Sequence, residues 1–171
     1  MMRIFFLLLF SGVMLACSNQ PKTAFQSNQT PEQTSKKLNF AQQYLALSSH
    51  QQAGNILDSF SKQERLYLSR YSIDYARLRG VYLTQSNQSD EAIKHYQKML
   101  KQYPKDVVLL NNFGVLLLSK KSSELACDLF NRAVIYSSQN SFSGLINLSR
   151  CELGSKNVDM ASIYLKRAKE I

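Results

Sequence analysis

The chain has 171 residues, 44% hydrophobic and 19% charged, so it is long enough for one folded domain and too apolar to be disordered. Six glycines and three prolines are too few for a turn-rich all-β protein. A formal charge of +9 is compatible with an anionic partner, and two histidines leave little material for a catalytic or metal site. Composition therefore favours a basic, helical binding protein over an enzyme.

Residues 1–16 have the features of a secretory signal peptide. One positive charge, Arg3, precedes a continuous apolar run over residues 4–10, and small residues follow before Cys17. The run is too short to cross a bilayer as a helix of the mature protein. We therefore expect these residues to be removed, which lowers the formal charge of the mature chain by one. Export also disfavours nucleic acid as a partner.

The junction Leu15-Ala16-Cys17 resembles the lipobox of bacterial lipoproteins, although Met14 stands where that family prefers leucine. In the family the cysteine is lipidated and becomes the new N-terminus, so the resemblance implies a lipid on Cys17. The alternative is an ordinary signal peptide followed by an unmodified cysteine. Ser18 after the cysteine, by resemblance to Gram-negative lipoproteins, favours anchoring at the periplasmic face of the outer membrane.

Residues 17–35 are predicted to form a flexible tether after the lipidated cysteine. They are mostly serine, asparagine, glutamine, threonine and proline, which bury too little apolar area to offset the entropy lost on ordering. As a coil, a segment of this length has a root-mean-square span of roughly 20–25 Å. We expect the tether to let the folded part search the space near the membrane.

Residues 36–171 repeat with a period of 34 to 35 residues. A small residue, a second small residue and a bulky apolar residue recur at fixed intervals. The repeat signature is Gly80, Ala92, Tyr96 and Pro104, then Gly114, Ala126 and Phe130, then Ser149, Ala161 and Leu165. The small residues let two helices approach closely, the bulky residue fills the gap between them, and the proline ends the second helix.

This spacing resembles the tetratricopeptide repeat (TPR), a pair of antiparallel helices. The resemblance implies an all-α solenoid of three to four helical hairpins, made of a degenerate unit 34–67 and units 73–106, 107–140 and 142–171. Turn and N-cap residues place the predicted helices at 34–47, 51–61, 72–86, 89–102, 106–119, 122–136, 141–153 and 157–170. No segment alternates with period two for long enough to indicate a sheet.

Two cysteines of the repeat region, Cys127 and Cys151, lie on helices predicted to be neighbours in the stack. They either form a disulfide, which an oxidising periplasm permits, or pack as two separate small apolar residues. His50 and His95 have no second histidine or carboxylate at a ligand spacing, so we expect no metal, no cofactor and no catalytic site.

The first helix of each TPR hairpin lines the concave face of the stack, and the family's concave positions can be transferred to this chain. The predicted partner-binding groove comprises Arg77, Val81, Val108, Asn111, Val115, Leu118, Ile146 and Arg150. Its apolar centre, with Asn111 for a partner's backbone and an arginine on either side, suits a helix or extended segment that carries an acidic group. The alternative is that the tether or a neighbouring copy covers it.

Residues 110–117, LNNFGVLL, together with Ala126 and Phe130, resemble TPR lipoproteins of pilus assembly. These are the PilF/PilW type of type IV pili and the TadD type of Flp (tight adherence) pili. The resemblance implies a non-catalytic scaffold or pilotin that helps a secretin ring assemble in the outer membrane. A general periplasmic adaptor, serving a protease or an outer-membrane assembly machine, is the alternative.

Overall fold

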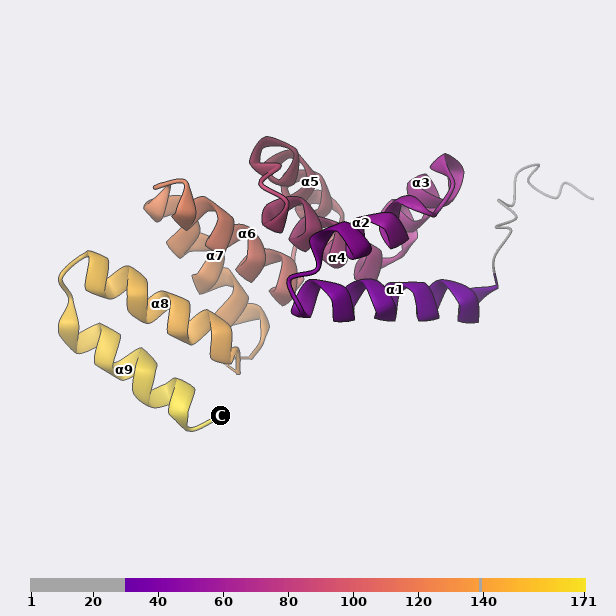
Figure 1. The fold of residues 1–171 in the computed structure, drawn as a ribbon. Helices are drawn as coiled ribbons and strands as arrows, with labels where there is room; N and C mark the ends of the chain where they lie inside the picture. Colours follow the sequence, from indigo (N-terminus) through magenta and orange to yellow (C-terminus); the bar gives the residue numbers. More distant parts are fainter. Residues whose placement is uncertain (1–29, 139) are drawn as a thin grey trace, which may run out of the picture.

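The computed structural model describes residues 30–138 and 140–171, and within them the chain forms nine α-helices and no strand (Figure 1). They are α1 (Pro31–Ala46), α2 (His50–Asp58), α3 (Lys62–Tyr71), α4 (Ile73–Gln85), α5 (Ser89–Gln102), α6 (Val107–Ser119), α7 (Ser123–Tyr136), α8 (Phe142–Gly154) and α9 (Val158–Lys169). Residues 1–16 and Cys17 lie outside the described part, so the signal peptide and the lipid stay predictions.

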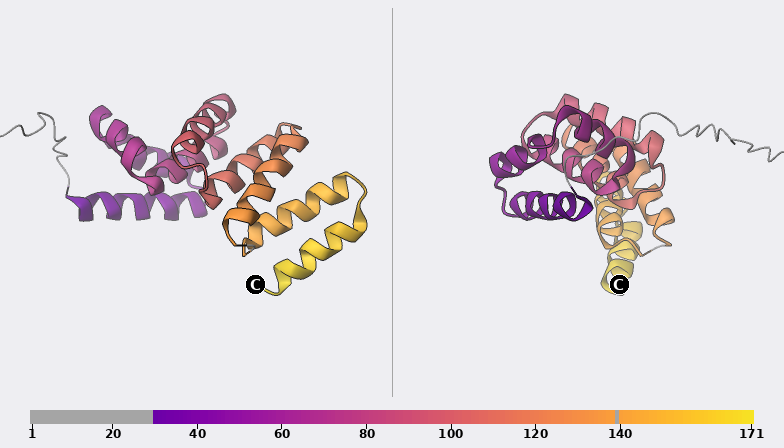
Figure 2. Two further views of the ribbon diagram at one scale, coloured as in Figure 1. Left: turned by 180° about the vertical axis from the view of Figure 1, so that it is seen from behind. Right: turned by 90° about the vertical axis from the view of Figure 1, so that its right-hand side faces the viewer.

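The helices form antiparallel pairs that follow one another along the molecule (Figures 1 and 2). The pairs are α1 with α2, α4 with α5, α6 with α7, and α8 with α9. The first helices of the pairs, α1, α4, α6 and α8, contact one another in that order. This arrangement is an all-α TPR-type solenoid, as the repeat spacing predicts.

The repeat signature produces close contacts between the two helices of a pair. A Cβ added at Gly80 would lie 2.6 Å from Cε1 of Tyr96, and one at Gly114 would lie 2.5 Å from Cε1 of Phe130. Both aromatic side chains are fully buried. The rings therefore occupy the space that the glycines leave, which confirms the expected packing for these two hairpins.

The last hairpin departs from this packing, because Leu165 is 45% exposed. Its neighbour Tyr164 packs against the core instead. Helix α9 is also the last of the described helices, so no further helix pair lies over Leu165. The prediction that Leu165 fills the gap between the helices of this unit is wrong.

Helix α1 begins earlier than the composition of the tether indicates. Thr30 Oγ1 accepts a hydrogen bond from Gln33 N (3.2 Å), and Gln33 Oε1 accepts one from Thr30 N (2.9 Å). This capping box, with Pro31 in the first turn, stabilises a helix start within a polar segment. Residues 31–35 therefore belong to α1, and the predicted boundaries of the tether (17–35) and of the repeat domain (36–171) are wrong by five residues.

Helix α3 was not expected, because the degenerate unit 34–67 predicts two helices. The structure ends α2 at Asp58 and starts a third helix at Lys62. Ser61 and Glu64 form its capping box, with Ser61 N donating to Glu64 Oε2 at 2.8 Å. The Ser-x-x-Glu spacing of a capping box could have indicated the start of this helix. The repeat period could not, because α3 is an insertion between two repeats.

The buried side chains form two apolar clusters that share α4. The larger cluster extends from α4 to α9, and the smaller one joins α1, α2, α3 and α4. Helix α4 gives Ala76 and Leu83 to the larger cluster and Tyr75 to the smaller one. Tyr82 packs against both, so it lies where the two clusters meet.

Candidate functional site

A cleft of about 880 Å³ lies between α1, α3, α4 and the start of α6. Its apolar lining includes Leu38, Leu45, Phe60, Leu68, Leu78, Val81 and Val108. Its uncharged polar lining includes Thr34, Ser35, Asn39, Gln42, Gln85 and Asn112. The charged residues of the lining are Glu64, Asp74 and Arg77. A mainly apolar lining with amide and hydroxyl groups is the usual composition of a site that binds a peptide segment.

One face of α1 forms a wall of this cleft. Thr34, Leu38, Gln42 and Leu45 recur at intervals of three or four residues, so they lie in one row along the helix. Leu38 and Leu45 are also members of the buried set, which fixes the face that α1 turns inward. The wall therefore comes from the part of the chain in which the repeat is weakest.

The structure brings together only part of the predicted groove. Arg77, Val81 and Val108 line the cleft. Further along the stack, Val115 is 44% exposed on α6, and Leu118 packs against the larger apolar cluster. The residues of α1 and α3 were missed, because α3 was not predicted and the concave positions were counted only from the units with a clear signature.

Arg77 is tied to two carboxylates of the protein itself. Its Nε and Nη2 donate to the two carboxylate oxygens of Asp106, at 3.2 and 2.5 Å, and its Nη1 donates to Asp74 at 3.3 Å. The hydrogen bonds that Arg77 donates to Asp106 raise the pKa of Arg77. Asp106 also caps α6 by accepting from Leu109 N at 2.8 Å. Arg77 therefore holds α4 against α6, and its expected role toward an acidic group of a partner stays a prediction.

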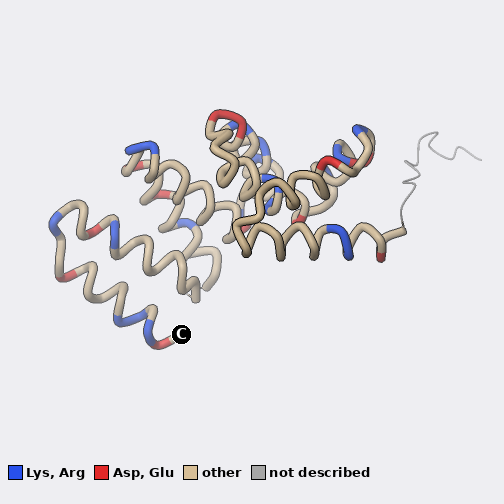
Figure 3. The backbone as a smooth tube through the Cα atoms, in the orientation of Figure 1, with Lys and Arg blue, Asp and Glu red and all other residues tan. Residues whose placement is uncertain are grey.

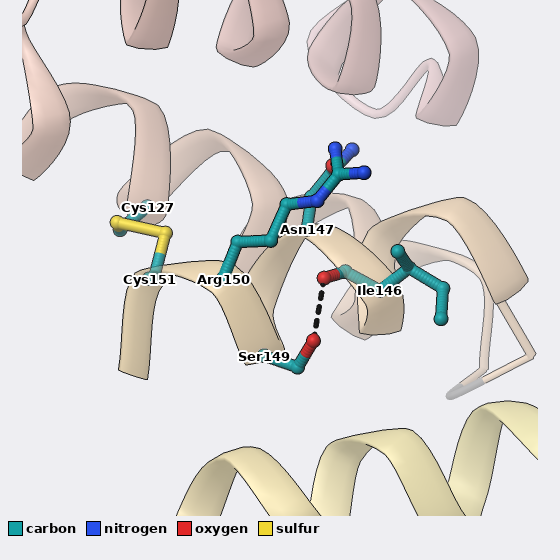
Figure 4. Close-up of a disulfide and its surroundings, with 6 residues drawn as sticks. All are labelled: Cys127, Ile146, Asn147, Ser149, Arg150 and Cys151. Atoms are coloured by element: carbon teal, nitrogen blue, oxygen red, sulfur yellow. Dashed lines mark hydrogen bonds between the residues drawn. A yellow bond between two sulfur atoms is a disulfide. The ribbon is translucent and has the colours of Figure 1, made fainter. Parts of the chain in front are cut away.

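The second polar element of the predicted groove connects α6 with α8. Asn147 Nδ2 donates to Asn111 Oδ1 at 2.9 Å, and Arg150 Nη1 donates to Asn147 Oδ1 at 3.2 Å. Figure 4 shows the Arg150 guanidinium beside Asn147. Ile146 of the same helix is half-buried and packs on the core. The side-chain carbonyl oxygen of Asn111 is thus used within the protein, and its expected role toward a partner's backbone stays a prediction.

The two cysteines of the repeat region form a disulfide between α7 and α8 (Figure 4). The Cα atoms of Cys127 and Cys151 are 5.9 Å apart. The bond joins the second helix of one hairpin to the first helix of the next. Of the two alternatives, the structure therefore has the paired one, and it fixes the relation between the last two repeats.

His95 has a structural role. His95 Nε2 lies 2.7 Å from the carbonyl oxygen of Ala76, and burial lowers the pKa of this histidine. It therefore packs α5 onto α4. Over the described residues, no group of three or more metal-binding side chains occurs, and no helix is both long and apolar enough to span a bilayer.

Neither a protein-family model nor a curated protein sequence matches the chain. Among solved structures, the crystal structure of MamA, a TPR-containing protein, is similar with a TM-score of 0.63 and 15% sequence identity. The similarity covers 82% of this chain and 78% of MamA. At this identity the comparison shows the fold alone, so the chain has a TPR-like helical solenoid fold, typical of protein-interaction scaffolds.

Proposed function

We propose that this protein is a lipid-tethered TPR scaffold that holds a segment of a protein partner in the cleft between α1, α3, α4 and α6. In this proposal Cys17 carries the lipid, the protein lies at the periplasmic face of the outer membrane, and the partner is a secretin or another component of pilus assembly. The protein acts as a pilotin and performs no catalysis. The cleft is the observation that carries the proposal.

The size and lining of the cleft support capture of a segment. Its volume of about 880 Å³ accommodates several side chains of a helix or an extended strand. Leu78, Val81 and Val108 offer apolar contacts, while Asn39 and Gln42 offer donors and acceptors for a backbone. These groups can bind and orient a partner segment, and the action of a pilotin requires no catalytic group.

The pilus assignment rests on the resemblance of residues 110–117 and of the lipobox to pilus-assembly lipoproteins. Phe113 and Gly114 of this segment are buried between helices. Those two positions therefore serve the fold, and the partner's identity depends on experiment. Deleting the gene tests it: loss of pili and of secretin multimers supports the proposal. Persistent pili with reduced levels of general outer-membrane proteins would instead establish the adaptor alternative.

Two valines of α6 offer a matched pair for testing the cleft. Val108 lines the cleft and is 41% exposed, whereas Val115, seven residues later, is 44% exposed and lies outside the lining. We expect Val108→Glu to abolish co-purification of the secretin and Val115→Glu to leave it unchanged. Circular dichroism checks that both variants fold. Equal retention of the secretin by both variants would refute the cleft as the binding site.

The lipid anchor has an independent test. Cys17→Ser removes the acceptor of the lipid, so we expect the protein to move from the membrane fraction to the soluble periplasm. The measurement is immunoblotting of separated envelope fractions. Retention in the membrane fraction would contradict the lipobox assignment without affecting the cleft.

A further inference from the structure

The outer face of α1 carries a row of large apolar side chains in contact with solvent. Phe40 is 54% exposed, Tyr44 36% and Leu47, at the C-cap, 74%. Their spacing of four and then three residues places them on one side of the helix, one turn apart. We call these three residues the apolar stripe.

The apolar stripe and the cleft lie on opposite sides of α1. Leu38 and Leu45 face the cleft and are 8% and 4% exposed. Phe40 follows Leu38 by two residues, and Leu47 follows Leu45 by two residues. A separation of two residues corresponds to about 160° around a helix. Whatever covers the apolar stripe therefore leaves the cleft open on the other side.

A terminal helix of a repeat stack ordinarily has a polar outer face, because that face meets water. Helix α1 is the first of the described helices, and the apolar stripe lies on its outer side. We propose that the apolar stripe rests in the interface of an anionic lipid bilayer, so that α1 lies on the membrane and the cleft opens away from it. This inference rests on the proposed function, which places a lipid on Cys17.

The length of the tether brings α1 to the membrane. Cys17 lies thirteen positions before Thr30, and the first turn of α1 follows directly. A coil of this length has a root-mean-square span of roughly 20 Å. A lipid on Cys17 therefore holds α1 closer to the headgroups than the helices that follow it in the stack. Such confinement raises the effective concentration of the apolar stripe at the membrane and strengthens a weak contact.

The chemistry of the apolar stripe and of its neighbours matches a lipid interface. Phenylalanine and leucine bury apolar area among the acyl chains, while a tyrosine ring lies at the level of the headgroups with its hydroxyl in water. Lys36 and Lys37 lie just before the stripe. Lys36 pairs with Glu32 at 2.7 Å, and Lys37 Nζ donates to Ser59 Oγ at 3.1 Å and lies 5.0 Å from the centre of the Phe60 ring. Figure 3 shows these charges on the first turns of α1. Two lysines against one acid leave α1 with a net charge of +1, and this charge favours anionic headgroups through the longer-range potential.

The chain offers a direct test, because it contains no tryptophan. A single tryptophan placed by Phe40→Trp reports the surroundings of the apolar stripe. Ile163→Trp is the matched control, because Ile163 is 48% exposed on α9 at the far end of the stack. The chain beginning at Cys17 is coupled through that thiol to a maleimide lipid, since the other two cysteines form the disulfide. The vesicles contain phosphatidylethanolamine and phosphatidylglycerol.

We expect the emission of the Phe40→Trp chain to move to shorter wavelength on coupling and to be quenched several-fold more by brominated acyl chains than that of Ile163→Trp. Tyr44→Gln and Leu47→Gln are then added to the Phe40→Trp chain. Among the coupled chains, we expect the ratio of stripes inserted in the bilayer to stripes in water to fall about tenfold, because two of the three apolar contacts are lost. Circular dichroism confirms that each variant folds. The same experiment without phosphatidylglycerol gives weaker quenching.

Equal quenching of the two tryptophans would overturn the inference. A blue shift of Phe40→Trp that grows with protein concentration in the absence of vesicles would also overturn it, since a second copy would then cover the apolar stripe. Chemical coupling makes the result independent of lipidation in the cell. Failure of this test therefore leaves the Cys17→Ser and Val108→Glu experiments standing, and failure of those experiments does not decide this one.

Discussion

Gly114 and Phe130 provide the sharpest test of how the repeat packs. Alanine at position 114 would favour the helix by about 1 kcal/mol relative to glycine. Its Cβ, however, would lie 2.5, 2.8 and 2.9 Å from three atoms of the Phe130 ring, well inside the optimum of roughly 3.5–4.0 Å. The ring is fully buried and has no space to withdraw, so we take the upper end of the overpacking cost, about 3 kcal/mol.

The two terms give a net loss of about 2 kcal/mol in the free energy of unfolding for Gly114→Ala. At about 4 °C per kcal/mol for a domain of this size, the midpoint of thermal unfolding falls by about 8 °C. Circular dichroism at increasing temperature measures it. Gly154→Ala is the control, because a Cβ there meets nothing within 4 Å, so it stabilises or is neutral.

A second variant separates the clash from any other effect of alanine. Phe130→Leu is itself destabilising because it removes a buried ring, but it leaves space for the new methyl group. We therefore expect Gly114→Ala to cost less in the Phe130→Leu background than alone, a coupling on the order of 1 kcal/mol. If Gly114→Ala is as stable as the parent chain, or its cost is the same in both backgrounds, the packing argument is refuted.

Three further predictions concern the other contacts. Replacing Cys127 and Cys151 by serine removes a bond that closes a segment of 24 residues, and we expect a loss of about 3 kcal/mol, seen as a lower midpoint that reductant no longer changes. Asp106→Ala removes a paired carboxylate and the α6 cap and costs about 2 kcal/mol in denaturant titrations, whereas Asp74→Ala, at an exposed ion pair, costs under about 0.5 kcal/mol. Burial lowers the pKa of His95 in the folded protein, so the unfolded chain binds a proton more readily. The free energy of unfolding therefore decreases as the pH falls from about 6.5, the ordinary pKa of histidine, toward the lower pKa of His95 in the folded protein. His95→Gln reduces this loss, and equal pH profiles of the two chains would contradict the assignment.

The sequence predicted the helix pairs of units 73–106 and 107–140, which carry the glycine, alanine and aromatic positions of the signature. Gly80 with Tyr96 and Gly114 with Phe130 are spaced by the geometry of a hairpin, so their contacts follow from the repeat period alone. The period could not locate α3, which is an insertion, nor the start of α1, which a local capping box decides within a polar segment. Both required local signals rather than the repeat.

The candidate site was less predictable. The concave positions transferred from the TPR family indicate which face of a helix a residue occupies, but they do not indicate which other residues contact it. Val81 and Val108 line the cleft, but α1, from which no groove residue was predicted, also lines it. Arg77 and Asn111 were expected to meet a partner, yet each is committed to another residue of the chain. Long-range pairs such as Arg77 with Asp106 depend on how the repeats stack, which the spacing within one repeat does not encode.

The division of the buried side chains into two clusters that share α4 has a consequence for the order in which the chain unfolds. Helices α1 to α3 depend on the smaller cluster, and α5 to α9 on the larger one, which also contains the disulfide-linked pair α7 and α8. Unfolding therefore proceeds as in a linear array, with the amide hydrogens of α1 to α3 exchanging sooner than those of α6 to α8. Tyr82, which packs against both clusters, sets how strongly the two halves unfold as one cooperative unit.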